Sequence, residues 1–193
     1  LLRLSAIETD PSEKRDLLYE YGRLLHTHLG QAAKAVTILR GVVEQLDPDF
    51  EPALDELIEA CTKCGDDVTL AVALERVLLR ERDDERRVEL AQRLADLCEY
   101  KLGDRDRAIG ALQVWVRAAS AELEPQRRLI ALLAASGRHQ ERLEQLDTLA
   151  ERTNSDAERV SAIVSAAELA FEQLRDADGA WSRLLPLTNR GEQ

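Results

Sequence analysis

The sequence predicts an all-α protein built from a repeated pair of helices. Three observations predict this fold. Apolar residues follow helical spacing along nearly the whole chain, no segment alternates with period two for long enough to form a strand, and the same pattern returns after about 73 residues. Aromatic residues make up only 4% of the chain, so leucine, alanine, valine and isoleucine must fill the core.

Helical spacing is clearest in the segment RDLLYEYGRLLHTHLG. There Leu17, Leu18, Tyr21, Leu24 and Leu25 recur at steps of three and four residues and form one apolar stripe. Short breaks such as LGQ, LDPDFEP, KCGDD, YKLGDRD and LRDADG separate such segments. They hold the glycine, proline and aspartate that end one helix and cap the next.

The repeat becomes visible when the chain is compared with itself. A shift of 73 residues aligns two sets of residues: Leu29, Gly30, Ala35, Val36, Leu39 and Val42 with Leu102, Gly103, Ala108, Ile109, Leu112 and Trp115. A further shift of about 72 residues brings in Leu174, Ala180, Trp181, Leu184 and Leu187. Each repeat holds four helices, which we expect to form two hairpins.

These intervals predict one repeat domain over residues 1–193. Residues 1–11 are expected to be the tail of a truncated preceding hairpin, followed by five hairpins at about 12–47, 48–83, 84–122, 123–154 and 155–189. The two tryptophans, Trp115 and Trp181, fall on apolar stripes and are expected to pack in the core or within hairpins. The chain contains no methionine, and we expect it to be part of a longer protein.

Charge limits the classes of partner. The chain carries 26 lysine and arginine residues against 37 aspartate and glutamate residues, a net charge of −11. A negative field disfavours nucleic acid and anionic membranes, so neither is expected as a partner. The longest apolar run, Leu129–Ala135, is too short to span a bilayer, and no signal peptide is recognisable. We expect a cytoplasmic protein.

One short motif, Cys61-x-x-Cys64, could be half of a zinc site or a redox centre. The alternative is one packed thiol and one turn thiol, because the repeat places Leu133 at the position of Cys61 and Ser136 at that of Cys64. The other candidate ligands, Cys98, His26, His28 and His139, form no second paired motif, and His26 falls in a position of solvent-exposed type. We therefore expect no metal, no cofactor and no catalytic residues, and no nucleotide or hydrolase motif indicates an enzyme.

Within the first hairpin the spacing reads Leu18-x-x-Tyr21-Gly22-x-x-Leu25, then Ala35-x-x-x-Leu39, then Pro48. This spacing resembles the tetratricopeptide repeat. Small residues recur in two slots where helices would cross closely: Gly22, Ala95 and Ala167, and then Ala35, Ala108 and Ala180. The chain departs from the pattern in three ways. The first large aromatic is absent, Ile58 and Ile130 replace the small residue in the even hairpins, and odd hairpins have about one extra residue between helices. The alternation resembles long arrays in large bacterial proteins.

The resemblance implies a right-handed superhelical solenoid that acts as a protein-interaction scaffold. Its concave face would bind a peptide or partner helix of basic or amphipathic character. The implied contact residues are Tyr19, Arg23, His26, Asp55, Glu59, Lys63, Gln92, Asp96, Glu99, Arg127, Glu168 and Phe171.

Other interpretations remain open. The same residues could form ordinary solvated helix faces, and the segment could be a regulatory arm of a catalytic domain. It could also be a structural spacer or self-association segment that forms a homodimer through apolar ends near Leu1, Leu4, Trp181, Leu184 and Leu187.

Overall fold

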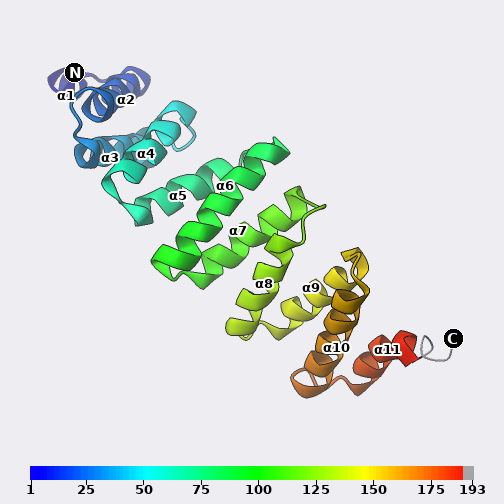
Figure 1. The fold of residues 1–193 in the computed structure, drawn as a ribbon. Helices are drawn as coiled ribbons and strands as arrows, with labels where there is room; N and C mark the ends of the chain where they lie inside the picture. Colours follow the sequence, from blue (N-terminus) through cyan, green and yellow to red (C-terminus); the bar gives the residue numbers. More distant parts are fainter. Residues whose placement is uncertain (189–193) are drawn as a thin grey trace. The chain divides into compact units, whose positions relative to one another are not determined.

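The protein is all helical. The computed structural model describes residues 1–188, and among them it contains helices and no strand (Figure 1). The helices are α1 (Leu2–Ile7), α2 (Pro11–Thr27), α3 (Ala32–Gly41), the π-helical η1 (Val42–Leu46), α4 (Glu51–Cys64), α5 (Asp67–Leu78), α6 (Asp84–Asp96), the π-helical η2 (Leu97–Leu102), α7 (Arg105–Ala118), α8 (Glu124–Ala135), α9 (His139–Arg152), α10 (Asp156–Glu172) and α11 (Ala177–Thr188). The predicted all-α class is confirmed.

Successive helices pair as hairpins. α2 packs on α3, α4 on α5, α6 on α7, α8 on α9 and α10 on α11, and the short α1 packs on α2. The five predicted hairpins are therefore present, and a short helix, α1, precedes them. Residue 189, the predicted end of the fifth hairpin, lies outside the described residues.

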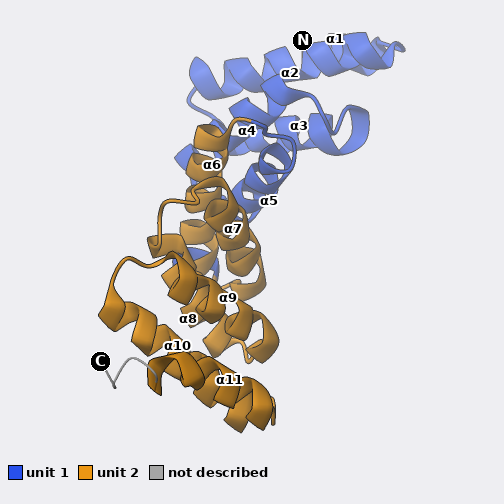
Figure 2. Ribbon diagram, turned by 90° about the vertical axis from the view of Figure 1, so that its right-hand side faces the viewer, with its two compact units in different colours: residues 1–82, 100–102 blue, residues 83–99, 103–193 orange. Residues whose placement is uncertain are grey.

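The helices group into two compact units (Figure 2). Unit 1 comprises residues 1–82 and 100–102, and unit 2 comprises residues 83–99 and the chain from 103 onward. Within unit 1, α4 packs on α3, and within unit 2, α8 packs on α7 and α10 on α9. Neighbouring hairpins within a unit therefore bury apolar stripes against each other, which is how helical repeats generate a core. The predicted single repeat domain stays a prediction.

Close helix crossings explain the small-residue slots. A Cβ atom added to Gly22 of α2 would lie 2.8 Å from both Cγ and Cδ2 of Leu39 on α3, too near for van der Waals contact. Ala95 and Ala167 occupy the same slot in the later copies and are buried. Small side chains at these positions allow the two helices of a hairpin to approach closely.

The extra residue of the odd hairpins is absorbed where their first helix ends. There a backbone amide donates to the carbonyl six residues earlier, whereas in even hairpins the interval is five. The wider pattern joins Gln31 to Leu25, Asp104 to Cys98 and Asp176 to Ala170; the narrower one joins Asp66 to Cys61 and Arg138 to Leu133. Each turn contains a left-handed residue, and the odd copies use Gly30, Gly103 and Arg175 with φ of 63°, 65° and 59°.

The structure decides the interpretation of the cysteine motif. Cys61 is fully buried in α4, whereas Cys64 is exposed at the end of that helix. Burial raises the pKa of the Cys61 thiol to about 12, so this thiol stays protonated near neutral pH. The prediction of one packed thiol and one turn thiol is confirmed.

The two tryptophans differ. Trp115 is buried as expected and donates from Nε1 to Glu122 at 3.2 Å. Trp181 was expected in the core or within its hairpin; a core position is wrong, because 62% of this residue is exposed on α11. Its stripe faces the end of the described array, where no further helix covers it.

Candidate functional site

The first candidate surface joins α2 to α4 in unit 1. Tyr19, Arg23 and His26 recur at steps of three and four residues and lie along one side of α2, and Asp55 and Glu59 lie one turn apart on α4. The ring of Tyr19 packs edge-on at 5.3 Å from that of Phe50, which precedes α4. Burial raises the pKa of Tyr19, and the charge of Arg23 opposes that shift.

Arg23 forms an ion pair within α2, in which its Nη2 donates a hydrogen bond to Glu20 at 2.8 Å. Lys63 and Gln92, two further predicted contact residues, are exposed on α4 and α6. No hydrogen bond of either side chain links it to the rest of the described chain. Lys63 and Gln92 are therefore surface residues, and their surroundings do not indicate a binding site.

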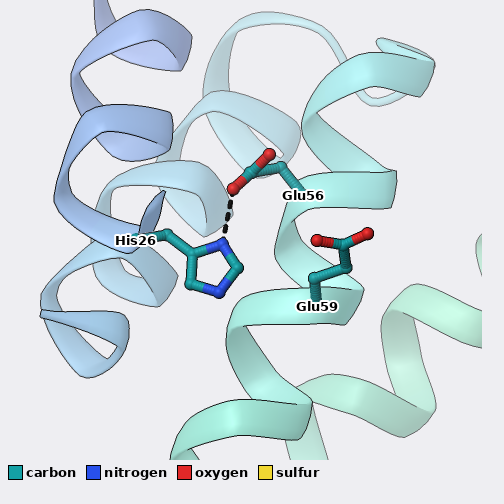
Figure 3. A group of neighbouring side chains, drawn as sticks. All are labelled: His26, Glu56 and Glu59. Atoms are coloured by element: carbon teal, nitrogen blue, oxygen red, sulfur yellow. Dashed lines mark hydrogen bonds and ion pairs between the residues drawn. The ribbon is translucent and has the colours of Figure 1, made fainter. Parts of the chain in front are cut away.

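The side chain of His26 is buried in this surface, at 8% exposure, so the expectation of a solvent-exposed position is wrong. Its Nδ1 lies 2.5 Å from Oε1 of Glu56, whose side chain is 13% exposed (Figure 3). The exposed Glu59 stands one turn further along α4 and brings a second carboxylate toward the same ring. Sequence reasoning identified His26 and Glu59 but missed Glu56.

The equivalent position in unit 2 holds an ion-pair cluster. Arg128 of α8 donates from Nη2 to Asp96 at 2.8 Å and to Glu99 at 2.7 Å. The guanidinium of Arg128 also lies 5.8 Å from the ring of Trp115. Asp96 and Glu99, both predicted as ligand contacts, are therefore engaged in joining neighbouring hairpins.

Arg127 connects the next two hairpins of unit 2. We call such a polar contact between the first helices of neighbouring hairpins a joint. Its guanidinium binds Glu158 of α10 through two hydrogen bonds, of 2.7 and 3.1 Å. Hydrogen bonds from Arg127 and from Thr153 lower the pKa of Glu158 to about 2. The structure thus gives three of the predicted contact residues, Asp96, Glu99 and Arg127, an intramolecular role that sequence reasoning did not foresee.

The remaining candidates, Glu168 and Phe171, line an open cleft between α10 and α11. The cleft has a volume of about 400 Å³ and is mainly apolar. Phe171 is 59% exposed and Trp181 is 62% exposed. The lining residues are Val164, Ala167, Glu168, Phe171, Glu172, Ala177, Ala180, Trp181 and Leu184.

The repeat shows what normally lies on this face. Phe171 takes the place of His26 and Glu99, which contact the first helix of the following hairpin. Trp181 takes the place of Val36 and Ile109, which are 4% and 1% exposed. In the earlier copies a helix covers this face. In the third copy Phe171 and Trp181 are exposed to solvent.

Helix length and hydropathy bear on the membrane question. None of the described helices is both long and apolar enough to cross a bilayer.

Comparisons with known proteins give matches only among solved structures. Neither a family model nor a curated protein matches the chain. A structure of nearly identical TPR-like repeats of a kinesin light chain from Podosopora anserina has 21% identity and a TM-score of 0.43, covering 96% of this chain and 100% of that one. YrrB, described as a TPR protein with an unusual peptide-binding site, has 18% identity and a TM-score of 0.41 over 86% of this chain and 81% of its own. MamA has 17% identity and a TM-score of 0.45 over 94% and 93%.

Proposed function

We propose that the chain is a protein-interaction module whose α10–α11 cleft binds an amphipathic, basic helix of a partner protein. The observation that carries the proposal is the exposure of Phe171 and Trp181 beside an apolar cleft. Exposed aromatic side chains that line a concave surface are typical anchors of protein interfaces.

The occupant is inferred to be a helix because helices cover the equivalent face in the earlier copies, where α4 packs on α3 and α8 on α7. Amphipathic helices commonly bind in such grooves through apolar residues spaced three and four apart.

The occupant is inferred to be basic because, among the described residues that line the cleft, only Glu168 and Glu172 are charged. The chain itself carries a net charge of −11, so a second copy would bring like charge to this face. A basic partner is therefore favoured over self-association.

Trp181 gives a direct readout of binding. In a Trp115→Phe background it is the only tryptophan, so its emission should shift to shorter wavelength when a helix covers it. The probe is a synthetic amphipathic helix with leucines at i, i+3, i+4 and i+7 and lysines on the flanks, compared with the same peptide carrying glutamates. We expect saturable binding of the lysine peptide and at least tenfold weaker binding of the glutamate peptide.

Paired variants test the location. Phe171→Ala should weaken binding of the lysine peptide at least tenfold, and Glu168→Lys with Glu172→Lys should reverse the peptide preference. Leu79→Ala is the matched control, because Leu79 is an apolar residue that is 85% exposed and does not line the cleft. Equal affinity of the parent and Phe171→Ala proteins would refute the assignment of this cleft.

Self-association is the second candidate function. It is favoured by exposed apolar residues at the other end of the described chain, where Leu1, Leu2 and Leu4 are 42%, 48% and 54% exposed. Light scattering over a wide concentration range separates the two functions. A dimer that Trp181→Ala abolishes would mean that a second copy occupies the cleft in place of a partner.

Two further expectations belong to the same proposal. A binding module of this kind needs no catalytic group, and the cytoplasm would suit its exposed Cys64 and its lack of disulfides among the described residues. Fractionation of cells that express the full protein would test the compartment.

A further inference from the structure

The joint between α2 and α4 contains a cluster that the proposed function does not use. His26, near the C-terminal end of α2, faces Glu56 and Glu59, which lie one turn apart on α4 (Figure 3). One ligand-type atom from each side chain lies within 4.8 Å of the other two. We propose that His26, Glu56 and Glu59 bind one divalent transition-metal ion, with Zn²⁺ as the best match.

The donor set fits this chemistry. An imidazole nitrogen with two carboxylate oxygens is a borderline ligand set that suits Zn²⁺, and it has too few oxygens for Ca²⁺. Three protein ligands leave one position of a tetrahedral ion for water or a partner's side chain. The buried His26 and the largely buried Glu56 form the floor, and the exposed Glu59 forms the open side.

Charge supports the assignment independently of distance. Within the described chain, no lysine or arginine forms a salt bridge with Glu56 or Glu59, and the neighbouring Arg23 is bound to Glu20. The equivalent joint of unit 2 differs, because the guanidinium of Arg128 lies between the carboxylates of Asp96 and Glu99. A metal ion at this position would add positive charge beside Glu56 and Glu59, as the guanidinium of Arg128 does beside Asp96 and Glu99.

Binding requires only side-chain movement. Zn²⁺ sits about 2 Å from each ligand, so its ligand atoms lie roughly 3.3 Å apart in a tetrahedral site. The 2.5 Å separation of His26 from Glu56 must therefore widen, and the exposed Glu59 must move inward. Since the ligands come from two hairpins, the bound ion would clamp α2 to α4.

The test uses Co²⁺ as the spectroscopic probe and then Zn²⁺ as its competitor. The chain is stripped of metal and titrated in a Cys64→Ser background, because the exposed Cys64 could itself bind metal. We expect one Co²⁺ per chain with the intense visible absorption of a four-coordinate site, displaced by one equivalent of Zn²⁺. Saturating Zn²⁺ should also raise the melting midpoint by several degrees, because only the folded chain holds the three ligands together and so binds the ion more tightly than the unfolded chain does.

Matched variants locate the ligands. Glu59→Gln changes an exposed residue and should weaken Co²⁺ affinity at least tenfold without altering the melting midpoint of the metal-free chain. His26→Ala should abolish the visible band. Two control variants change exposed residues nearby. His28→Ala lies two residues from His26, and Glu51→Gln lies on α4 with the two glutamates. Both should bind Co²⁺ with the affinity of the parent.

Two outcomes would overturn the proposal. One is the absence of stoichiometric binding by the folded Cys64→Ser protein. The other is a band of unchanged intensity and affinity in Glu59→Gln. Neither outcome would affect the α10–α11 cleft, which lies in the other unit and is measured through Trp181.

Discussion

In both units a polar pair joins the first helices of neighbouring hairpins, but the acid and the base lie on opposite helices. Where the first helix of one hairpin meets that of the next, unit 1 places His26 against Glu56, and unit 2 places Glu99 against Arg128. The repeat aligns His26 with Glu99 and Glu56 with Arg128, so acid and base have exchanged helices. The repeat therefore preserves the position of the polar pair but not which of the two helices carries the acid.

The apolar slots behave differently from the joint. Leu39 in unit 1 and Leu112 in unit 2 are both fully buried at the same repeat position. Their neighbours differ only slightly, since Gly22 lies against Leu39 and Ala95 occupies that slot in unit 2. Burial and helix crossing restrict these residues tightly, whereas a polar joint requires only complementary partners.

The largest expected effect tests whether the two apolar slots are equivalent. Leu39→Ala and Leu112→Ala should each lower the free energy of unfolding by about 2–5 kcal/mol, through lost burial and a residual cavity. Urea unfolding followed by circular dichroism measures both. A cost near zero in either variant would contradict the repeat register, and Leu79→Ala at an exposed position serves as the control.

A charge exchange at the joint should give the next largest effect. His26→Glu places a carboxylate against Glu56, and Glu56→Arg removes the acceptor of His26, so each single change should destabilise unit 1. The double variant installs the arrangement of unit 2 and should recover most of that loss. We expect a coupling energy of about 1–3 kcal/mol from the double-mutant cycle. Additive single effects would show that the two joints are not interchangeable.

The sequence contained enough information for the helices and the apolar slots. Helical periodicity and the repeat both predict buried positions for four residues, and the structure confirms all four: Leu39, Leu112, Ala35 and Ala108. The cysteine motif was assigned in the same way, through Leu133 in place of Cys61.

The polar joints could not be predicted in this way. Arg128 and Glu56 sit at equivalent positions with opposite charges, so the repeat gave no signal that either one is a partner. The sequence predicts Trp181 in the core or within its hairpin because its apolar stripe aligns with Val36 and Ile109. Its exposure depends on whether a neighbouring helix is present, which is a property of the array and not of the local pattern.

A smaller effect is expected from the turns that end the first helix of each odd hairpin. Gly30 and Gly103 adopt positive φ without strain, but Arg175 adopts a φ of 59° with a side chain that disfavours this conformation. Arg175→Gly should therefore raise the free energy of unfolding by up to about 1 kcal/mol. Gly103→Ala should lower it by a similar amount. A destabilised Arg175→Gly protein would show that the arginine side chain contributes more than its backbone costs.

The smallest effect is the acid sensitivity of the Arg127–Glu158 joint in unit 2. The pKa of Glu158 falls from 4.5 to about 2, first because Arg127 donates to its carboxylate and second because Thr153 does. The unfolded chain therefore takes up a proton at higher pH than the folded chain. The stabilisation is fully present above pH 4.5 and is lost as the pH falls from about 4.5 to about 2.

Melting midpoints measured between pH 7 and pH 3 should show this loss in the parent protein and less of it in Glu158→Gln, which has no carboxylate to protonate. Glu144→Gln is the control, since Glu144 is an exposed acid of α9 whose carboxylate has no hydrogen-bond partner among the described residues. Its pH profile should match that of the parent. If Glu158→Gln retains the full acid dependence, other carboxylates cause it, and the Arg127–Glu158 pair does not contribute to it.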